Sequence, residues 1–425
     1  MAAIAPDWSP FVVSAPGKVI LFGEHAVVYG KAAIAGSLNL RAYALVTPRV
    51  DQRVRLVLPD ISVDALLDIQ ALPLLNSDDL EHPGDVEPLV RDTISIPEGP
   101  GRTAVLTFIY LYGCLFSQSS RSAGFTICVR SLLPVGAGLG SSASFNVALS
   151  AALLRLTGWL QSDGLSAEDK KLINTWAFRG EQVAHGTPSG IDNSVATYGG
   201  FVLYQRGHDT VDLQSKHALR VLITNTNVPK STKALIAGVR ALKDKYPSVV
   251  DGILDNIHSI STSAADLFRG TDQVDVQELE TQTQDIIRIN HGLLYTLGVS
   301  HPSLERIREV TAVHGMASKL TGAGGGGCAL TLIPHNVAGG EVEAVSGELA
   351  EEGFECYETV VGGPGVTITR SVGAAPVEQW VSDMLDQHIS LTRSDRQDVS
   401  ADAFGNIVSG FVALPESAIS RLSLL

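Results

Sequence analysis

The sequence predicts an α+β protein of two domains. The chain has 425 residues, enough for two or three domains of ordinary size, and 45% of them are hydrophobic, so a sizeable core can form. Strand and helix patterns alternate up to about residue 228, whereas helices dominate from residue 229. We therefore expect one domain over residues 1–228, a second over 229–373, and a tail over 374–425 to which the sequence assigns no role.

Short apolar segments predict the strands of the first domain. Two of them, 11–15 and 19–21, flank a predicted turn at Pro16–Lys18. The remaining predicted strands are 38–46, 54–58, 125–130, 201–204 and 218–224. Helices are expected over 103–116, from Ser142 onward, and over 167–184 with Ser166 as the N-cap. Residues 72–101 are rich in proline, glycine and acidic residues, which predicts an excursion over the surface.

Helical periodicity predicts most of the second domain. The predicted helices are 233–243, 249–268, 276–297 and 302–314. Two apolar strands follow, 329–333 and 358–361, with a helix at 340–351 between them and a last strand at 366–369. This mixture of helices and strands is what makes the second domain α+β.

The charge and the cysteines exclude several classes of function. The formal net charge of −14 argues against nucleic acid or an anionic membrane as a partner. The four cysteines form no Cys-x-x-Cys pair and no Cys/His cluster, so neither a zinc site nor a disulfide framework is expected. No signal peptide or membrane-spanning segment is recognisable, so we expect a soluble protein in a reducing compartment.

The segment Pro134–Ser142 carries the strongest functional signal. It reads Pro-Val-Gly-Ala-Gly-Leu-Gly-Ser-Ser and lies between a predicted strand and a predicted helix. Glycines let the backbone turn successive N–H groups toward one point, and the helix adds the positive end of its dipole. The pattern predicts an anion site, with phosphate as the favoured ligand. The alternative is a tight strand–helix turn that needs glycine for geometry alone.

A second motif, Ser14–Gly30, places Lys18, Glu24 and His25 within eight residues. A lysine close to a carboxylate and a reacting hydroxyl would stabilise the anionic forms of both groups. The alternative is a hairpin with surface charges, which is the simpler interpretation of any one of these residues alone.

Two further segments complete the set of motifs. Glu181, in a predicted helix, and Asp192, in Gly-Thr-Pro-Ser-Gly-Ile-Asp-Asn, are separated by a turn, so they could face one pocket. The alternatives are a solvated helix face for Glu181 and a turn or cap residue for Asp192. Residues 322–327 contain five glycines in six positions ahead of a strand, which favours a tight loop against a ligand or another loop over a flexible linker.

The four motifs, in this order, resemble those of the GHMP kinase superfamily, and they are similar to those of eukaryotic-type mevalonate kinases. The matching segments are Pro-Gly-Lys-Val-Ile-Leu-x-Gly-Glu-His-Ala-Val-Val, Gly-Ala-Gly-Leu-Gly-Ser-Ser-Ala, Gly-x-Pro-Ser-Gly-x-Asp-Asn and Lys-Leu-Thr-Gly-Ala-Gly-Gly-Gly-Gly-Cys. The likeness includes Thr224–Lys233 and covers about residues 10–372, but not the tail. It implies the GHMP kinase fold, with a ribosomal S5 domain 2-like ATP-binding domain, a ferredoxin-like α+β C-terminal domain, and the active site in the cleft between them.

The resemblance also implies ATP- and Mg²⁺-dependent phosphorylation of the 5-hydroxyl of (R)-mevalonate, giving 5-phosphomevalonate and ADP in isoprenoid and sterol biosynthesis. Asp192 matches the catalytic aspartate, Lys18 the lysine beside it, and Ser142 and Glu181 the Mg²⁺ ligands. Glu24 and His25 fall where the family contacts its substrate, and Thr232 matches a threonine that supports the active site. The implied nucleotide-binding residues are Lys18, Ser131, Gly136, Ala137, Gly138, Leu139, Gly140, Ser141 and Ser142.

The expected chemistry depends on positioning and charge neutralisation. A free aspartate has a pKa of about 3.9, too low to deprotonate an alcohol early, so we expect Asp192 to orient the hydroxyl and accept its proton late. The carboxylate of mevalonate needs a cation, for which Lys230, Arg206 and His25 are candidates that the sequence does not distinguish. Asp60 replaces an asparagine that relatives can have near the nucleotide, so its role stays open.

Two other interpretations stay open from the sequence. One is another GHMP kinase, acting on phosphomevalonate or a sugar such as galactose. The other is a non-catalytic metabolite-binding regulator on the same fold, against which the presence of Lys18, Ser142, Glu181 and Asp192 argues. The family further implies a cytoplasmic homodimer, feedback inhibition by prenyl diphosphates, and no nucleic-acid or membrane partner.

Overall fold

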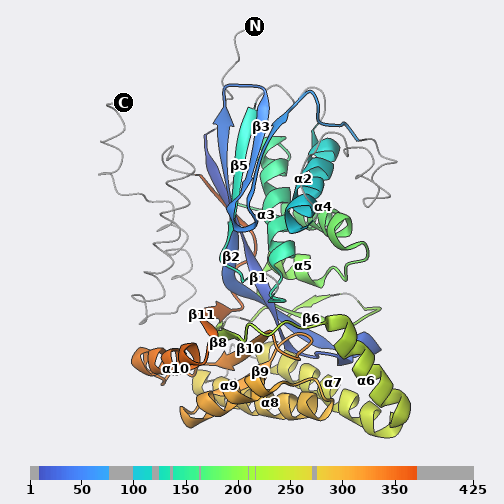
Figure 1. The fold of residues 1–425 in the computed structure, drawn as a ribbon, viewed down its shortest axis with the longest axis vertical. Helices are drawn as coiled ribbons and strands as arrows, with labels where there is room; N and C mark the ends of the chain where they lie inside the picture. The colour runs from blue at the N-terminus through green and yellow to red at the C-terminus, as the bar shows by residue number, and fades with distance from the viewer. Residues whose placement is uncertain are drawn as a thin grey trace.

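One mixed sheet runs through the whole described chain. The structure is a computed structural model that describes residues 9–75, 99–116, 124–134, 137–161, 164–208, 210–215, 217–269 and 275–370. Within these residues the sheet has twelve strands, and its main path is β4-β3-β5-β2-β11-β8-β10-β9. β1 pairs with β2 and β12, and β6 pairs with β2 and β7. Figure 1 shows helices α2–α5 beside the upper part of the sheet and α6–α10 around its lower part.

The strands and helices have the following bounds. The strands are β1 (Phe11–Phe22), β2 (Ala33–Arg49), β3 (Arg53–Leu58), β4 (Val63–Asp68), β5 (Gly124–Ser131), β6 (Phe201–Tyr204), β7 (Val211–Asp212), β8 (Leu219–Asn225), β9 (Ala317–Leu320), β10 (Cys328–Leu332), β11 (Glu355–Val361) and β12 (Thr367–Arg370). The α-helices are α2 (Pro100–Leu115), α3 (Ser141–Leu156), α4 (Ala167–His185), α5 (Ile191–Tyr198), α6 (Thr232–Lys245), α7 (Pro247–Arg269), α8 (Val276–Thr296), α9 (Pro302–Val313) and α10 (Gly339–Glu351). Two short 3-10 helices are η1 (Ala26–Tyr29) and η2 (Pro59–Ile61).

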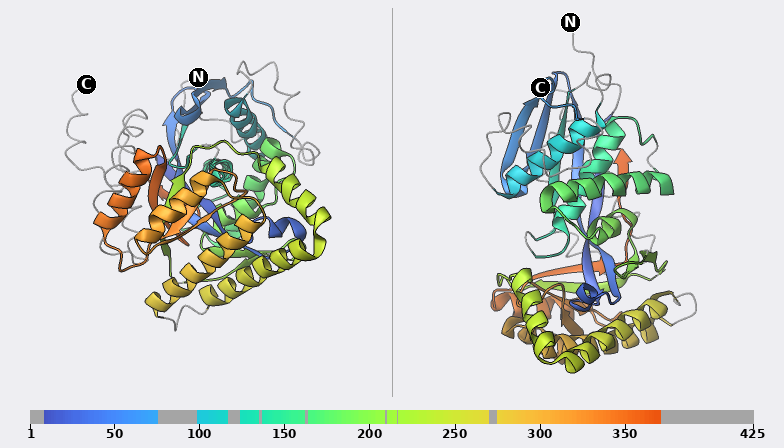
Figure 2. Two further views of the ribbon diagram at one scale, coloured as in Figure 1. Left: turned by 60° about the horizontal axis from the view of Figure 1, so that its bottom comes forward. Right: turned by 90° about the vertical axis from the view of Figure 1, so that its right-hand side faces the viewer.

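Two long antiparallel strands join the halves of the molecule. β2 has 17 residues, of which the last eight pair with β5 while the first four pair with β6. β1 pairs with β2 along its whole length. In Figures 1 and 2 both strands run from the part that holds α2–α5 into the part that holds α6–α10. Residues of β1 and of the segment that follows it therefore lie where the two parts meet.

The buried apolar residues of the described chain form three large clusters and a fourth, small one. The first core joins β1, β2, β3 and β5 to α2, α3 and α4. Another lies among α7, α8, α9 and α10. The third cluster contains Leu139 together with Val221 of β8 and Ala264 of α7. Leu139 belongs to the segment 134–142, which we call the glycine loop. Burial of Leu139 in this cluster anchors the glycine loop to the part of the molecule that contains β8 and α7.

Most predicted elements are present within a few residues of their expected bounds. The α+β architecture is confirmed, and Ser166 caps α4 in a capping box with Asp169. The predicted turn at Pro16–Lys18 is wrong, because β1 continues through it as one strand with a register shift between Pro16 and Gly17. The Lys18 N–H leaves the β1–β2 ladder at this point and donates to the Leu139 carbonyl at 2.8 Å.

The helix α5, the strands β4, β7 and β9 and the two 3-10 helices were not predicted. α5 follows the glycine at position 190, where a turn was expected. β4 and β9 also lacked a prediction, although each pairs along its length with a neighbouring strand. β12 returns to the first part of the molecule, where it pairs with the start of β1.

Some expectations concern segments outside the described residues. These are most of the predicted excursion, residues 76–98, and the tail from residue 371 onward. Among the helices that the structure does describe, none is both long and apolar enough to cross a bilayer.

Candidate active site

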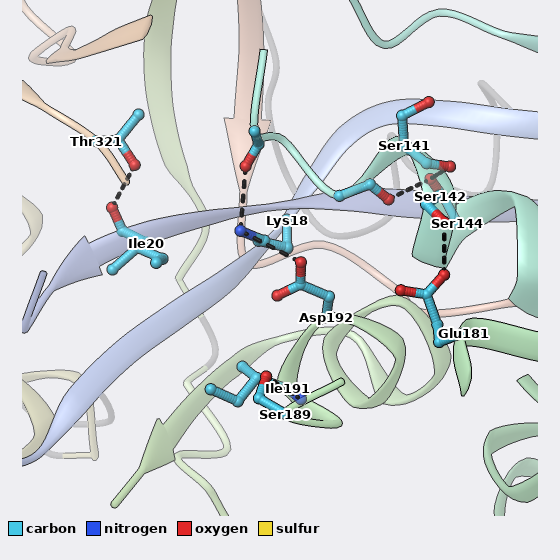
Figure 3. A network of polar contacts seen from close by, with 12 residues as sticks. Lys18, Ile20, Ser141, Ser142, Ser144, Glu181, Ser189, Ile191, Asp192 and Thr321 are labelled. Atoms are coloured by element: carbon cyan, nitrogen blue, oxygen red, sulfur yellow. Dashed lines mark hydrogen bonds and ion pairs between the residues drawn. The ribbon is translucent and has the colours of Figure 1, made fainter. Parts of the chain in front are cut away.

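Lys18 and Asp192 form an ion pair at the centre of the site. Lys18 Nζ lies 3.4 Å from Asp192 Oδ2 and donates a hydrogen bond to the Gly138 carbonyl at 3.1 Å. The Lys18 side chain is 9% exposed and that of Asp192 is 39% exposed. Figure 3 shows the ammonium group between the aspartate and the backbone of the glycine loop. The two groups are close enough to interact, and the Asp192 side chain is partly exposed to solvent.

The described residues of the glycine loop before α3, 137–140, pack against Lys18. Gly138 and Gly140 have φ values of 81° and 78°, a left-handed conformation that favours glycine. A Cβ at Gly140 would lie 2.9 Å from Cγ of Lys18, so the loop packs directly on the lysine. Gly140 is the N-cap of α3, and among the described residues no side chain caps this first turn. Its N–H groups are therefore available to bind an anion.

Ser142 and Glu181 meet across α3 and α4. Ser142 Oγ donates to Glu181 Oε1 at 2.6 Å, as Figure 3 shows. His185 Nε2, one turn further along α4, lies 3.1 Å from Ser142 Oγ. A carboxylate only accepts, so the serine proton points to Glu181 and a lone pair of Oγ stays available for a cation. His185 was not among the site residues predicted from the sequence.

Asp192 is positioned by the packing of α5 against α4. It lies in the first turn of α5, after Gly190, whose φ is 80°. The next residue, Asn193, is buried and donates from its amide to Asn174 Oδ1 on α4 at 2.7 Å. Thr197 Oγ1 also donates to Asn174 Oδ1, at 3.5 Å. Asn174 thus fixes α5 on the helix that carries Glu181.

Lys230 is a second cation beside the glycine loops. A Cβ at Gly138 would lie 3.5 Å from Lys230 Nζ, and one at Gly327 would overlap the same side chain. Burial lowers the pKa of Lys230, and nearby Lys18 lowers it further. A lysine held near another lysine against two glycine-rich loops is a natural partner for a multiply charged anion. Of the other two residues predicted as possible partners of a substrate carboxylate, Arg206 is exposed and His25 contacts the Ala323 carbonyl.

The glycine-rich loop between β9 and β10 is tightly folded. Its glycines at 322, 324, 325, 326 and 327 all have positive φ values between 65° and 118°. A Cβ at Gly324 would overlap the Val299 carbonyl oxygen, and one at Gly326 would lie 2.8 Å from the Val228 side chain. The Thr226 hydroxyl also donates to the Gly327 carbonyl at 2.8 Å. These contacts favour the predicted tight loop over a flexible linker.

Glu24 lies in a sealed cluster rather than beside Asp192. Its carboxylate forms an ion pair with Lys319 of β9, and both side chains are 0% exposed. Asn290 of α8 donates to the other carboxylate oxygen at 3.2 Å. Burial raises the pKa of Glu24 and lowers that of Lys319, while the attraction between them opposes both shifts. Direct contact between Glu24 and a substrate, as expected from the sequence, would require this ion pair to open.

His25 connects the same two segments. Its Nε2 lies 2.8 Å from the Ala323 carbonyl, so the ring donates to the glycine-rich loop. Burial lowers its pKa, and its φ of 60° is unusual for a residue other than glycine. Thr321 adds a hydrogen bond to the Ile20 carbonyl at 2.9 Å. The segment Ser14–Gly30 is thereby attached to the segment Lys319–Cys328 at several points.

The remaining predicted site residues occupy the borders of this region. The Ser131 N–H donates to Asp60 Oδ2 at 2.7 Å, and Asp60 Oδ1 forms an ion pair with Arg130 at 3.2 Å. Asp60 therefore holds the end of β5. Thr232 is exposed in the first turn of α6. Ala137 and Leu139 are buried, Ser141 opens α3, and Gly136 lies outside the described residues.

Comparisons with known proteins show the family of this chain. The family model "GHMP kinases N terminal domain" matches residues 106–200, and "GHMP kinases C terminal" matches residues 266–349. The mouse mevalonate kinase is 42% identical over 87% of this chain and 98% of its own length. The human mevalonate kinase is 41% identical over 88% and 98%, respectively.

The chain belongs to the mevalonate kinase family. It is therefore an enzyme, and a non-catalytic regulator is no longer a competing interpretation. Solved mevalonate kinases share the fold. The Methanococcus jannaschii enzyme has a TM-score of 0.61 and 24% identity over 84% of this chain and 99% of that chain. The L. major enzyme in complex with R-mevalonate has a TM-score of 0.59 and 24% identity over 86% of this chain and 99% of that chain.

Proposed function

We propose that this mevalonate kinase family member transfers the γ-phosphoryl group of Mg²⁺-bound ATP to the 5-hydroxyl of (R)-mevalonate, giving 5-phosphomevalonate and ADP. The observation that carries the proposal is the juxtaposition of the Lys18–Asp192 pair with the glycine loop, through the hydrogen bond from Lys18 to the Gly138 carbonyl. Relatives about 40% identical over most of the chain are mevalonate kinases. The product would enter isoprenoid and sterol biosynthesis.

The donor groups at Ser142 and Glu181 fit Mg²⁺. Both are hard oxygen donors, and the hydroxyl proton already points to the carboxylate. Among the described residues, no cluster of three or more His, Cys, Asp or Glu side chains could hold a metal by itself. Such a sparse set suits an ion that keeps water molecules and shares phosphate oxygens. When bound there, Mg²⁺ would neutralise charge on the phosphates.

The protein's own groups have separate roles in the proposed reaction. The N–H groups at the start of α3 hold the phosphates. Asp192 orients the 5-hydroxyl and accepts its proton as the new P–O bond forms. Lys18 holds Asp192 in position through their ion pair and offsets charge on the transferred group.

Glu24 and His25 have a supporting role in this proposal. They hold the segment Lys319–Ala323 against the end of β1 through the ion pair and the ring hydrogen bond. This contact fixes the position of β1, which carries Lys18. The mevalonate carboxylate then requires a cation near the site. We assign this role to Lys230 rather than to Arg206, because Lys230 lies beside Lys18.

A substrate comparison tests the proposal. ATP consumption should depend on mevalonate, and phosphomevalonate and galactose should support only background rates. A galactokinase and a phosphomevalonate kinase share the fold at 19% and 16% identity, which does not speak for either substrate. A higher kcat/KM with galactose or phosphomevalonate than with mevalonate would overturn the proposal.

The proposal extends to assembly, regulation and location. We expect a homodimer in the cytoplasm that prenyl diphosphates inhibit in competition with ATP, because such ligands carry the diphosphate that the glycine loop would bind. Light scattering at several concentrations tests the dimer. Inhibition by farnesyl diphosphate that is insensitive to ATP concentration would contradict a shared site.

A further inference from the structure

A stripe of polar residues lies on the face of α3 that meets α4. Ser142, Asn146 and Ser150 are spaced four residues apart, so they follow one another along one side of the helix. The rest of this stretch of α3 is largely apolar and buried. Asn146 is 1% exposed and Ser150 is 0% exposed. Buried polar side chains at these positions need an explanation other than core packing.

Asn146 has one partner of functional interest. Its Nδ2 donates to Glu181 Oε1 at 2.6 Å, to the same oxygen that accepts from Ser142. A carboxylate accepts but does not donate, so only the NH₂ side of the amide can face it, and the orientation of the Asn146 amide follows. Oε1 thus has two donors from successive turns of α3.

The other half of the Asn146 amide makes this arrangement costly. Its Oδ1 is buried without a hydrogen-bond partner among the described residues. A Cβ at position 180 would lie 2.5 Å from this oxygen, so Gly180 provides the space for the amide. An unsatisfied buried carbonyl destabilises the fold. An apolar side chain would avoid this cost, which indicates that Asn146 serves Glu181.

We propose that Asn146 is a positioning residue that fixes Oε1 of Glu181 and thereby presents the Ser142 hydroxyl and Glu181 Oε2 to the divalent cation of the bound nucleotide. The inference rests on the proposed function, in which Ser142 and Glu181 hold Mg²⁺. Groups that hydrogen-bond to metal ligands orient them, and their loss commonly weakens metal affinity by about 10- to 100-fold. In this chain the supporting group comes from the same helix face as the serine ligand.

Divalent-cation binding tests the inference without relying on turnover. The affinity of Mn²⁺ for the complex with a non-hydrolysable ATP analogue would be measured by electron paramagnetic resonance for wild type, Asn146→Leu and Asn146→Ala. Both variants should weaken Mn²⁺ binding about tenfold, while analogue binding in EDTA stays unchanged. Asn146→Leu should also keep the wild-type unfolding temperature, because it fills the space and removes the unsatisfied carbonyl.

Two controls separate the possible failures. Ser150→Ala removes the next polar group on the same buried face, whose hydroxyl has no hydrogen-bond partner among the described residues, and should leave Mn²⁺ affinity unchanged. Wild-type Mn²⁺ affinity in both Asn146 variants, or an equal loss in Ser150→Ala, would overturn the inference. Glu181→Gln tests the underlying proposal: if it binds Mn²⁺ normally, Glu181 is not a ligand. If Glu181→Gln weakens binding and the Asn146 variants do not, only the role of Asn146 is wrong.

Discussion

Two lysine–carboxylate pairs lie at either end of the segment 18–24 and have opposite surroundings. Lys18 and Asp192 are 3.4 Å apart, and the aspartate side chain is 39% exposed. The side chains of Glu24 and Lys319 are both 0% exposed, and Asn290 donates a hydrogen bond to the carboxylate. An open pair can exchange partners with a substrate, whereas removal of one member of a sealed pair leaves an unpaired buried charge. We therefore propose that the first pair serves the chemistry and that the second pair serves the structure that holds it.

The largest expected effect is on the open pair. Asp192→Asn should lower turnover by about 10²- to 10⁴-fold, because the amide cannot accept the hydroxyl proton. Nucleotide affinity, measured by calorimetry, should change little. Asp212→Asn, at an exposed position on β7, is the matched control. Near-normal turnover of Asp192→Asn would remove this residue from the mechanism.

The sealed pair should respond in stability instead. Glu24→Gln removes one charge of a fully buried pair and should lower the free energy of unfolding by about 3–5 kcal/mol. Lys31 forms an ion pair with Asp255 at the surface, so Lys31→Met should leave stability nearly unchanged. Chemical denaturation measures both. Equal losses of stability in the two variants would show that burial does not increase the contribution of the Glu24–Lys319 pair to the free energy of unfolding.

The glycine loop offers a smaller and more local test. Gly140→Ala introduces a side chain at a φ of 78° and 2.9 Å from Cγ of Lys18. Gly158 has the same φ of 78°, but no atom lies within 4 Å of its Cβ position. Both variants should lose about 1–2 kcal/mol of stability from the backbone conformation. Only Gly140→Ala should also reduce turnover. Equal turnover in the two variants would show that the packing of the loop against Lys18 does not affect the reaction.

The smallest expected effect is on the pH dependence of stability. Burial lowers the pKa of His25 and of His291, so both stay neutral in the folded protein where the unfolded chain, with a pKa of about 6.5, becomes protonated. The unfolded state then binds more protons, and the free energy of unfolding should fall as pH drops below about 6.5 toward the folded-state pKa values. The slope should not exceed about 1.4 kcal/mol per pH unit for each histidine.

Replacing one of these histidines tests the assignment. His25→Gln keeps a side-chain donor for the Ala323 carbonyl but cannot titrate. Denaturation curves at several pH values between about 5 and 7 should therefore show a shallower slope for this variant than for wild type. An unchanged slope would mean that His25 does not contribute.

The sequence predicted the elements with strong local patterns. The N-cap at Ser166 and the strand–glycine loop–helix arrangement around Gly138 follow from neighbouring residues, and the structure confirms them. It missed α5, because this helix has only eight residues and follows a Pro-Ser-Gly segment that indicates a turn.

The partners of the site residues were mostly not predictable. Glu24 and Lys319 are 295 positions apart, and nothing in the local pattern around either residue indicates that they pair. The Asn174–Asn193 contact depends on the angle between two helices. One signal was available and unused: Ser142, Asn146 and Ser150 recur every four residues in an apolar helix, which indicates a buried polar face.

The most direct test of the difference between the two pairs is the same substitution in each. Turnover and the free energy of unfolding would be measured side by side for Lys18→Met and Lys319→Met. Lys18→Met should lose at least about 10²-fold in turnover with almost wild-type stability, since Asp192 remains solvated. Lys319→Met should lose about 3–5 kcal/mol of stability, because Glu24 is left unpaired. A Lys319→Met protein of normal stability without turnover, or a Lys18→Met protein that is unstable, would contradict the account.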